Sequence, residues 1–174
     1  MTATSTSLDG AKLREVLGHY PTGVVLVTGT AADGERLAMI VGTFTSVSLE
    51  PALVAFLPMR SSGTFARLRE CESLCINILS GDQEEVCRTI VARREDKFRD
   101  LDWFPPSPPS GDPVLAGSVA WLDVRLTDTI EAGGSLDRHV HRTRHGDPQS
   151  GVPADLLPAR VRHVHHAVAG GPDR

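Results

Sequence analysis

The fold is decided by residues 39–51, which read MIVGTFTSVSLEP. Within this stretch, the side chains of Phe44–Leu49 alternate between the two faces of an extended chain, the period-2 pattern of a β-strand. Glu50 and Pro51 then turn the chain, and Leu53–Leu57 is a short apolar run that predicts another strand. Short strands joined by tight turns favour an antiparallel barrel or sandwich over a parallel α/β sheet.

The same signs recur on both sides of this stretch. Val24–Thr28 is a β-branched run, and Asp33-Gly34 is a favourable hairpin turn before a strand over Leu37–Val41. Ser62 is a suitable N-cap for a helix. We expect helices over 11–19, 62–70 and 81–94, strands over 74–79 and 119–126, and a loop over the Pro-, Ser- and Gly-rich residues 105–113.

Composition excludes several classes of protein. The chain has 174 residues and a net charge of −4, without the clustered Lys and Arg that nucleic-acid binding requires. No apolar run approaches the roughly 20 residues of a membrane helix, and residues 1–10 are small and polar. We therefore expect a disordered N-terminal tail over 1–10, no nucleic-acid or membrane partner and a cytoplasmic location. The three cysteines lack CxxC spacing and are expected to be unpaired thiols.

Four segments in this order resemble the short-chain flavin reductases, the reductase components of two-component flavin monooxygenases. They are Pro21–Val24, residues 39–51, the run Arg60–Thr64 (RSSGT) and Asp96–Phe98 (DKF). The resemblance covers about residues 11–131. It implies a mainly β fold with flanking helices, an FMN-binding split β-barrel of Greek-key antiparallel type. It also implies a homodimer, FMN or FAD as cofactor, and NADH or NADPH as co-substrate.

The resemblance places the flavin ring along one strand. It implies that Thr43, Phe44, Thr45 and Ser46 line the isoalloxazine, whose electronics are tuned by hydrogen bonds at its polar edge. Gly42 departs from many relatives, which have Asn at this position. On the residues alone, a surface strand whose hydroxyls face water is the competing interpretation.

The resemblance also places the flavin tail. A phosphate is favoured where a helix begins, because free N–H groups point outward there. The residues implied for this role are Arg60, Ser61, Ser62 and Thr64, with Lys97 near the flavin tail and Phe98 against the ring. An ordinary helix cap with a solvated arginine is the competing interpretation, and Lys97 could instead pair with Glu95 or Asp96. No acid–base residue is expected, because hydride passes directly from nicotinamide to flavin.

The sequence changes character after Glu131. Residues 132–174 contain no Phe, Trp, Tyr, Lys or Glu, and they hold six of the seven histidines. Relatives normally continue with Gly-Asp-His and end in an aromatic-rich segment. We hypothesise a frameshift near Gly133, and we expect a poorly ordered His- and Arg-rich tail over 132–174.

Three functions follow, in descending order of preference. The first is an NAD(P)H-dependent flavin reductase that supplies reduced flavin to a monooxygenase. The second is a flavin- or haem-binding split-barrel protein with impaired or no reductase activity, because the nicotinamide site would lie in the altered tail. The third is a metal-binding protein that uses the tail histidines, since imidazole suits Zn, Cu or Ni.

Overall fold

The computed structural model describes residues 9–93, 95–104, 111–130 and 159–166. These residues form a seven-stranded sheet, a separate two-stranded sheet and three helices. The strands of the large sheet are β1 (Val25–Thr30), β2 (Arg36–Val41), β3 (Thr45–Leu49), β4 (Ala52–Ala55), β5 (Leu74–Ile78), β8 (Ala120–Leu126) and β9 (Ala159–His166). The other elements are β6 (Trp103–Phe104), β7 (Val114–Leu115), α1 (Gly10–Leu17), α2 (Gly63–Leu68) and α3 (Glu84–Ala92).

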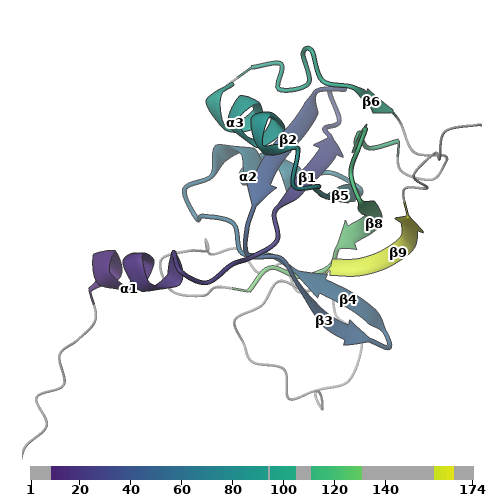
Figure 1. Cartoon of the computed structure of the whole chain (residues 1–174). Helices are drawn as coiled ribbons and strands as arrows, with labels where there is room; N and C mark the ends of the chain where they lie inside the picture. The colour runs from purple at the N-terminus through teal and green to yellow at the C-terminus, as the bar shows by residue number, and fades with distance from the viewer. Residues whose placement is uncertain (1–8, 94, 105–110, 131–158, 167–174) are drawn as a thin grey trace, which may run out of the picture.

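The large sheet is antiparallel and strongly curved. Its strand order is β2-β1-β5-β8-β9-β4-β3, so β2 and β3 lie at opposite edges although only residues 42–44 separate them in sequence (Figure 1). Val41 of β2 and Val54 of β4 nevertheless pack in one hydrophobic cluster. The curvature therefore brings the two ends of the sheet around a shared core. This confirms the predicted mainly antiparallel β fold with few helices.

The inner strand β1, next to the edge strand β2, is buried on both faces. Val25 and Val27 pack into the larger cluster with Phe56, Phe65 and other residues of β4, β5, β8 and α2. Leu26 faces the other way, into a second cluster with Ile90 of α3. This alternation is the period-2 geometry of a strand, and it sets α2 and α3 against different faces of the same sheet.

A buried polar network ties the segment 112–115 to the centre of the sheet. The Asn77 side-chain amide donates to the Leu26 carbonyl (3.2 Å), and its oxygen accepts from the Leu115 N–H (2.9 Å). The Asp112 carboxylate accepts from the Thr30 N–H (2.9 Å) and from the Ser73 hydroxyl (2.7 Å). Burial raises the pKa of Asp112, while these two hydrogen bonds oppose the rise. The side chains of Asn77, Ser73 and Asp112 in this network thus have hydrogen-bond partners inside the protein.

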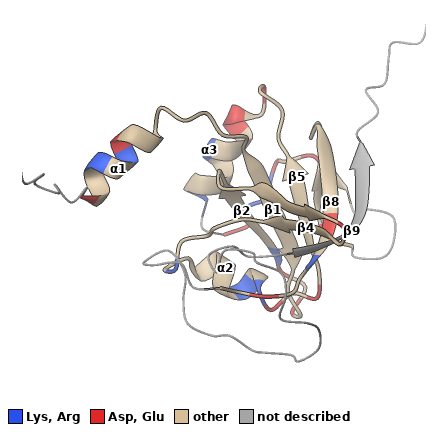
Figure 2. Ribbon diagram, turned by 90° about the horizontal axis from the view of Figure 1, so that it is seen from below, with Lys and Arg blue, Asp and Glu red and all other residues tan. Residues whose placement is uncertain are grey.

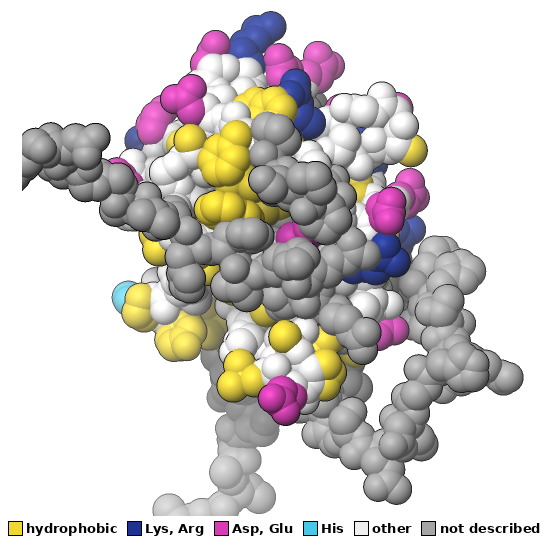
Figure 3. All heavy atoms as spheres, turned by 90° about the vertical axis from the view of Figure 1, so that its right-hand side faces the viewer, with side chains coloured by type: hydrophobic (Ala, Val, Ile, Leu, Met, Phe, Trp, Pro, Cys, Tyr) yellow, Lys and Arg dark blue, Asp and Glu magenta, His cyan; other side chains and the backbone are white. Residues whose placement is uncertain are grey.

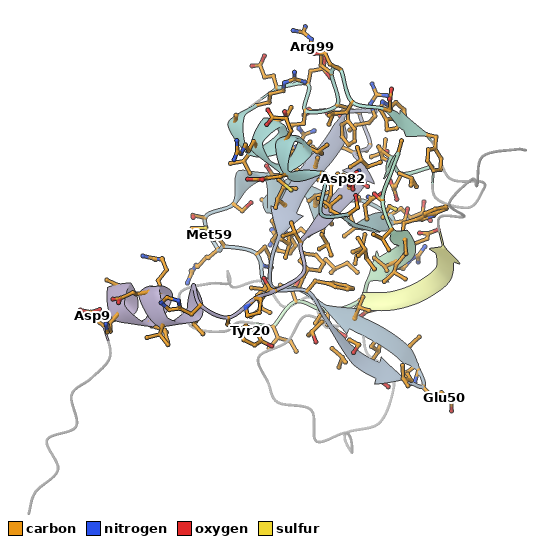
Figure 4. The ribbon with its side chains drawn as sticks, viewed as in Figure 1. Asp9, Tyr20, Glu50, Met59, Asp82 and Arg99 are labelled. Atoms are coloured by element: carbon orange, nitrogen blue, oxygen red, sulfur yellow. The ribbon has the colours of Figure 1, made fainter. Side chains whose placement is uncertain are left out.

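Helix α1 lies apart from the rest of the described structure (Figure 1). It begins after Asp9, whose carboxylate accepts from the Lys12 N–H (2.7 Å), and none of its residues is buried. It carries both basic and acidic side chains (Figure 2). Its apolar residues Leu13, Val16 and Leu17 are exposed, as is Tyr20 in the segment that leads to β1 (Figure 4).

Most expected elements are present, with shifted ends. Ser62 caps α2 as predicted, with Phe65 and Leu68 buried, and Gly34 takes a positive φ of 83° in the hairpin turn. The two-residue strands β6 and β7 were not predicted. No described helix is long and apolar enough to cross a membrane, and the three cysteines are free thiols.

The predicted tails fall mostly outside the described residues. This applies to residues 1–8, to most of the His- and Arg-rich tail over 132–174 and to the proposed frameshift near Gly133. Within that tail, residues 159–166 form β9, which lies between β8 and β4 in the sheet. The third function hypothesis rests on histidine side chains that are not described, and no metal-ligating group of three is found among the side chains that are.

Candidate functional site

The strand predicted to line a flavin ring is the outer strand of an exposed hairpin. β3 pairs with β4, with Thr45 opposite Ala55 and Ser46 opposite Val54, and Glu50 lies at the hairpin tip (Figure 4). Thr45 and Ser46 are exposed. Because β3 ends the sheet in the described structure, its outer edge offers backbone N–H and C=O groups as well as these hydroxyls.

Thr43 and Phe44 have structural contacts of their own. The Thr43 hydroxyl donates to the Leu57 carbonyl (3.0 Å) and accepts from the Leu57 N–H (3.0 Å). It therefore fastens the start of the hairpin to the segment that leads toward α2. Phe44 is half-buried and packs against the larger core cluster.

The predicted phosphate turn precedes a helix of only six residues. The Ser62 hydroxyl accepts from the Phe65 N–H (3.1 Å), so its oxygen already serves as the helix cap. Arg60 and Ser61 are exposed and Thr64 is half-buried. Arg60 has a partner of its own in this structure.

Lys97 contacts the backbone of β2 rather than a neighbouring carboxylate. Its ammonium donates to the Ala38 carbonyl of β2 (3.1 Å) and makes no ion pair with any described residue, including Glu95 and Asp96. Burial lowers its pKa, because the charged form loses water there. A half-buried cation without an acidic partner is a site suited to an anionic ligand.

A cavity of about 190 Å³ brings together two of the residues that were predicted to bind the phosphate-bearing tail of the flavin. Thr64 and Lys97 both line it. Its other polar lining residues are Glu35, Arg36, Arg67 and Asp96. Arg67 is already neutralised by Asp33 (3.2 Å) and Glu35 (2.5 Å). Lys97 is therefore a cation of this cavity without an acidic partner among the described residues, as is Arg36, which also lines it.

Phe98, which was predicted to lie against the flavin ring, is almost fully buried. It is 4 % exposed and packs in the second core cluster, edge-on to Trp103 at a centroid distance of 6.0 Å. Asp96, two residues earlier, has a positive φ of 42°. This backbone turn sends Phe98 into the core while Lys97 reaches β2.

Two nearby residues were not identified from the sequence. Arg67 shares the cavity with Lys97, and Arg36 lies over the Trp103 ring at 4.3 Å. Both contacts join residues far apart in sequence. Neither residue belongs to a motif that could have indicated its role.

Comparison with known proteins identifies the family. The Flavin reductase like domain matches residues 17–170. The chain belongs to the flavin reductase-like domain family. A flavin reductase from Pseudomonas putida is 44 % identical over 128 residues, which cover 74 % of each chain.

Two further members of the flavin reductase family show its range. The reductase subunit HsaB of a flavin-dependent monooxygenase from Rhodococcus jostii is 35 % identical over 74 % of this chain and 64 % of its own. Component B of nitrilotriacetate monooxygenase from Mycobacterium thermoresistibile superposes with a TM-score of 0.75 at 26 % identity. That superposition covers 93 % of this chain and 78 % of the other.

These matches confirm the predicted activity. The protein is an NAD(P)H-dependent flavin reductase of the kind that supplies reduced flavin to monooxygenases. Two of the relatives, HsaB and Stc3, are themselves reductase subunits, of a flavin-dependent monooxygenase and of stachydrine N-demethylase.

Proposed function

We propose that the β3 hydroxyls and the Lys97 cavity are two ends of one flavin site, which takes FMN or FAD. The observation that carries this proposal is the half-buried Lys97 ammonium without an acidic partner. A phosphate fits this donor set, because a charge-assisted hydrogen bond from an ammonium is among the strong ones. Thr64 adds a hydroxyl in the same cavity.

The two ends are joined through short connections in the chain. Thr43 is bonded to Leu57, and the chain from Leu57 runs directly into the turn that caps α2. The Ser62 hydroxyl lies 3.7 Å from the Met39 sulfur, next to the β2 carbonyl that holds Lys97. The chain from the β3–β4 hairpin thus leads to the turn before α2, and this turn contacts β2.

The chain's own residues have simple tasks in this proposal. A bound flavin supplies the hydride acceptor. Thr45 and Ser46 would orient its ring along the β3 edge, and Lys97 and Thr64 would hold its phosphate. Positioning of this kind accelerates hydride transfer without a protein acid or base. Phe98, being buried, would support Lys97 from the core.

Replacement of Lys97 tests the proposal directly. Lys97→Gln should weaken FMN binding by about 1.5–3 kcal/mol, roughly ten- to a hundredfold, the range for hydrogen bonds to charged groups. The matched control is Lys12→Gln, since Lys12 lies on α1 in an exposed pair with Glu15. Fluorescence titration of both variants gives the answer. Equal FMN affinity in Lys97→Gln and the control would contradict the site.

A second measurement separates the reductase from an impaired flavin-binding protein. NADH oxidation by the purified chain should be slow alone and fast with added FMN. Bound flavin without NADH oxidation would instead favour the impaired protein.

We further propose a homodimer in which the curved sheet forms a split barrel and α1 docks on the second copy. An isolated helix of eight residues is unstable in water, yet α1 buries none of its residues. Other hydrophobic side chains are also exposed on the body of the molecule (Figure 3). Leu13→Asp combined with Leu17→Asp should convert a dimer to a monomer in analytical ultracentrifugation. An unchanged dimer would show that α1 is not the contact.

A further inference from the structure

Arg36, the first residue of β2, has an unusual set of contacts. Its guanidinium lies 4.3 Å from the centre of the Trp103 ring and 6.0 Å from that of Phe98. The side chain makes no hydrogen bond or ion pair with any described residue. Stacking on an aromatic ring holds the guanidinium plane but uses none of its five N–H donors. The outer face and the donor edge are thus left for another molecule.

A cavity of about 460 Å³ opens beside this guanidinium. It is lined by Gly34, Glu35, Arg36, Glu95, Asp96 and Phe98. The volume is within the roughly 300–1,000 Å³ typical of small-molecule sites. Arg36 and Asp96 also line the smaller cavity that contains Lys97 and Thr64, so the two cavities share a wall.

The charges in the larger cavity are mixed. Asp96 is paired with Arg99 (3.6 Å) and Glu35 with Arg67 (2.5 Å), whereas the Glu95 carboxylate has no partner among the described residues. A free carboxylate accepts hydrogen bonds from hydroxyl and amino groups, and it repels a phosphate. The ligand that fits here therefore carries hydroxyl or amino donors and a flat ring, with its anionic part toward Arg36 and Lys97.

We propose that this cavity binds the adenylate half of a dinucleotide. The purine would stack on the outer face of the Arg36 guanidinium, as bases stack on arginine planes elsewhere. Glu95 would accept from ribose hydroxyls or from the adenine amino group, and the Arg36 donor edge would meet the second phosphate. Adenylate belongs to both FAD and NADH, and the cavity's chemistry is the same for either. The proposal rests on the flavin site at Lys97, which provides the adjoining phosphate position.

The test compares FMN with FAD, which differ by the adenylate group alone. Full-length protein is titrated with each flavin by fluorescence, and the KM for NADH is measured with FMN as the acceptor. The variants are Arg36→Gln and Arg36→Lys, which keeps the charge but loses the plane. Arg88→Gln is the matched control, because Arg88 is an exposed α3 residue paired with Glu84. Thermal unfolding of each variant reports any effect on the fold.

We expect Arg36→Gln to weaken FAD binding roughly tenfold more than it weakens FMN binding, the scale of one base stacked on a side chain. Arg36→Lys should recover only part of the loss. A raised KM for NADH with both flavin affinities intact would also support the adenylate site and would assign it to the nicotinamide dinucleotide.

Two results overturn the adenylate site. One is an equal loss of FMN and FAD affinity, and the other is no change in any of the three measurements. Wild-type protein that binds neither flavin would instead overturn the proposed flavin site. The two failures are therefore distinguishable.

Discussion

The centre of the sheet and the β3–β4 hairpin use the same kinds of side chain in opposite ways. Thr28 of β1 is fully buried, and its hydroxyl lies within hydrogen-bond distance of the Cys75 and Pro113 carbonyls. Ser46 of β3 is exposed and has no such partner among the described residues. Hydroxyls at the centre hold the fold together, whereas those on the hairpin are available to a ligand. The centre should therefore govern stability and the hairpin should govern binding.

The largest expected effect on stability comes from truncating a buried side chain in the hydrophobic core of the sheet. Ile76→Ala on β5, where the side chain is 0 % exposed, should lower the free energy of unfolding by about 2–5 kcal/mol through lost burial and the cavity left behind. Leu49→Ala on β3, where the side chain is 86 % exposed, should change it by less than about 0.5 kcal/mol. Urea denaturation of both variants makes the comparison. Similar losses would mean that the hairpin is covered in solution.

The next effect concerns the buried polar network. Asn77→Leu keeps the side-chain size but leaves the Leu115 N–H and the Leu26 carbonyl without their partners. We expect a loss of about 1–3 kcal/mol, the cost of leaving a buried polar group unsatisfied. Hydrogen exchange should show faster exchange at the Leu115 amide than in the wild type. Unchanged protection of the Leu115 amide would show that the polar network does not hold the segment 112–115 in place.

Within the site, substitutions of Thr43 and Ser46 should have different effects, the first on stability and the second on flavin binding. Thr43→Val removes the hydroxyl that bridges both Leu57 backbone groups and should cost stability of about 1 kcal/mol. Ser46→Ala should leave stability unchanged and weaken flavin binding by about 0.5–1.5 kcal/mol, less than roughly tenfold. Thermal unfolding and flavin titration of each variant give four values. The reverse assignment would show that Thr43, rather than Ser46, contacts the ligand.

The smallest effect is a pH dependence at Asp112. Its pKa is raised by burial above the ordinary 3.8, so the folded state binds a proton that the unfolded state has already released. This contribution to stability is fully present below pH 3.8 and is lost as the pH rises through the folded-state pKa. Wild type should therefore gain stability relative to Asp112→Asn as the pH falls from neutral toward 4. A parallel pH profile for the two proteins would mean that the hydrogen bonds from Ser73 and Thr30 cancel the effect of burial.

The sequence predicted the local parts of this structure well. The Ser62 cap, the Asp33-Gly34 turn and the alternating strands depend on residues close together in the chain. β6 and β7 have two residues each, too short for any periodicity to indicate them. Their pairing is set by tertiary contacts instead.

The candidate site was only partly predictable for the same reason. The motif indicated Lys97, but its partner Ala38 lies on β2, and the absence of an acidic partner appears only in the folded protein. Phe98 was expected against a flavin ring because aromatic residues suit that role. The structure buries it with Leu26 and Ile90. Arg36 could not be found from sequence, because its stacking on Trp103 is created by the fold.

The position of β9 bears on how the chain is made. β9 pairs with β8 on one side and with β4 on the other, and it is the strand through which the β3–β4 hairpin joins the rest of the sheet. A ribosome releases the hairpin long before it releases residues 159–166. Until then the nascent chain has two unfinished edges, and such edges favour pairing with other chains. Completion of the sheet is therefore a late event of synthesis, and a chaperone that covers these edges would act in that interval.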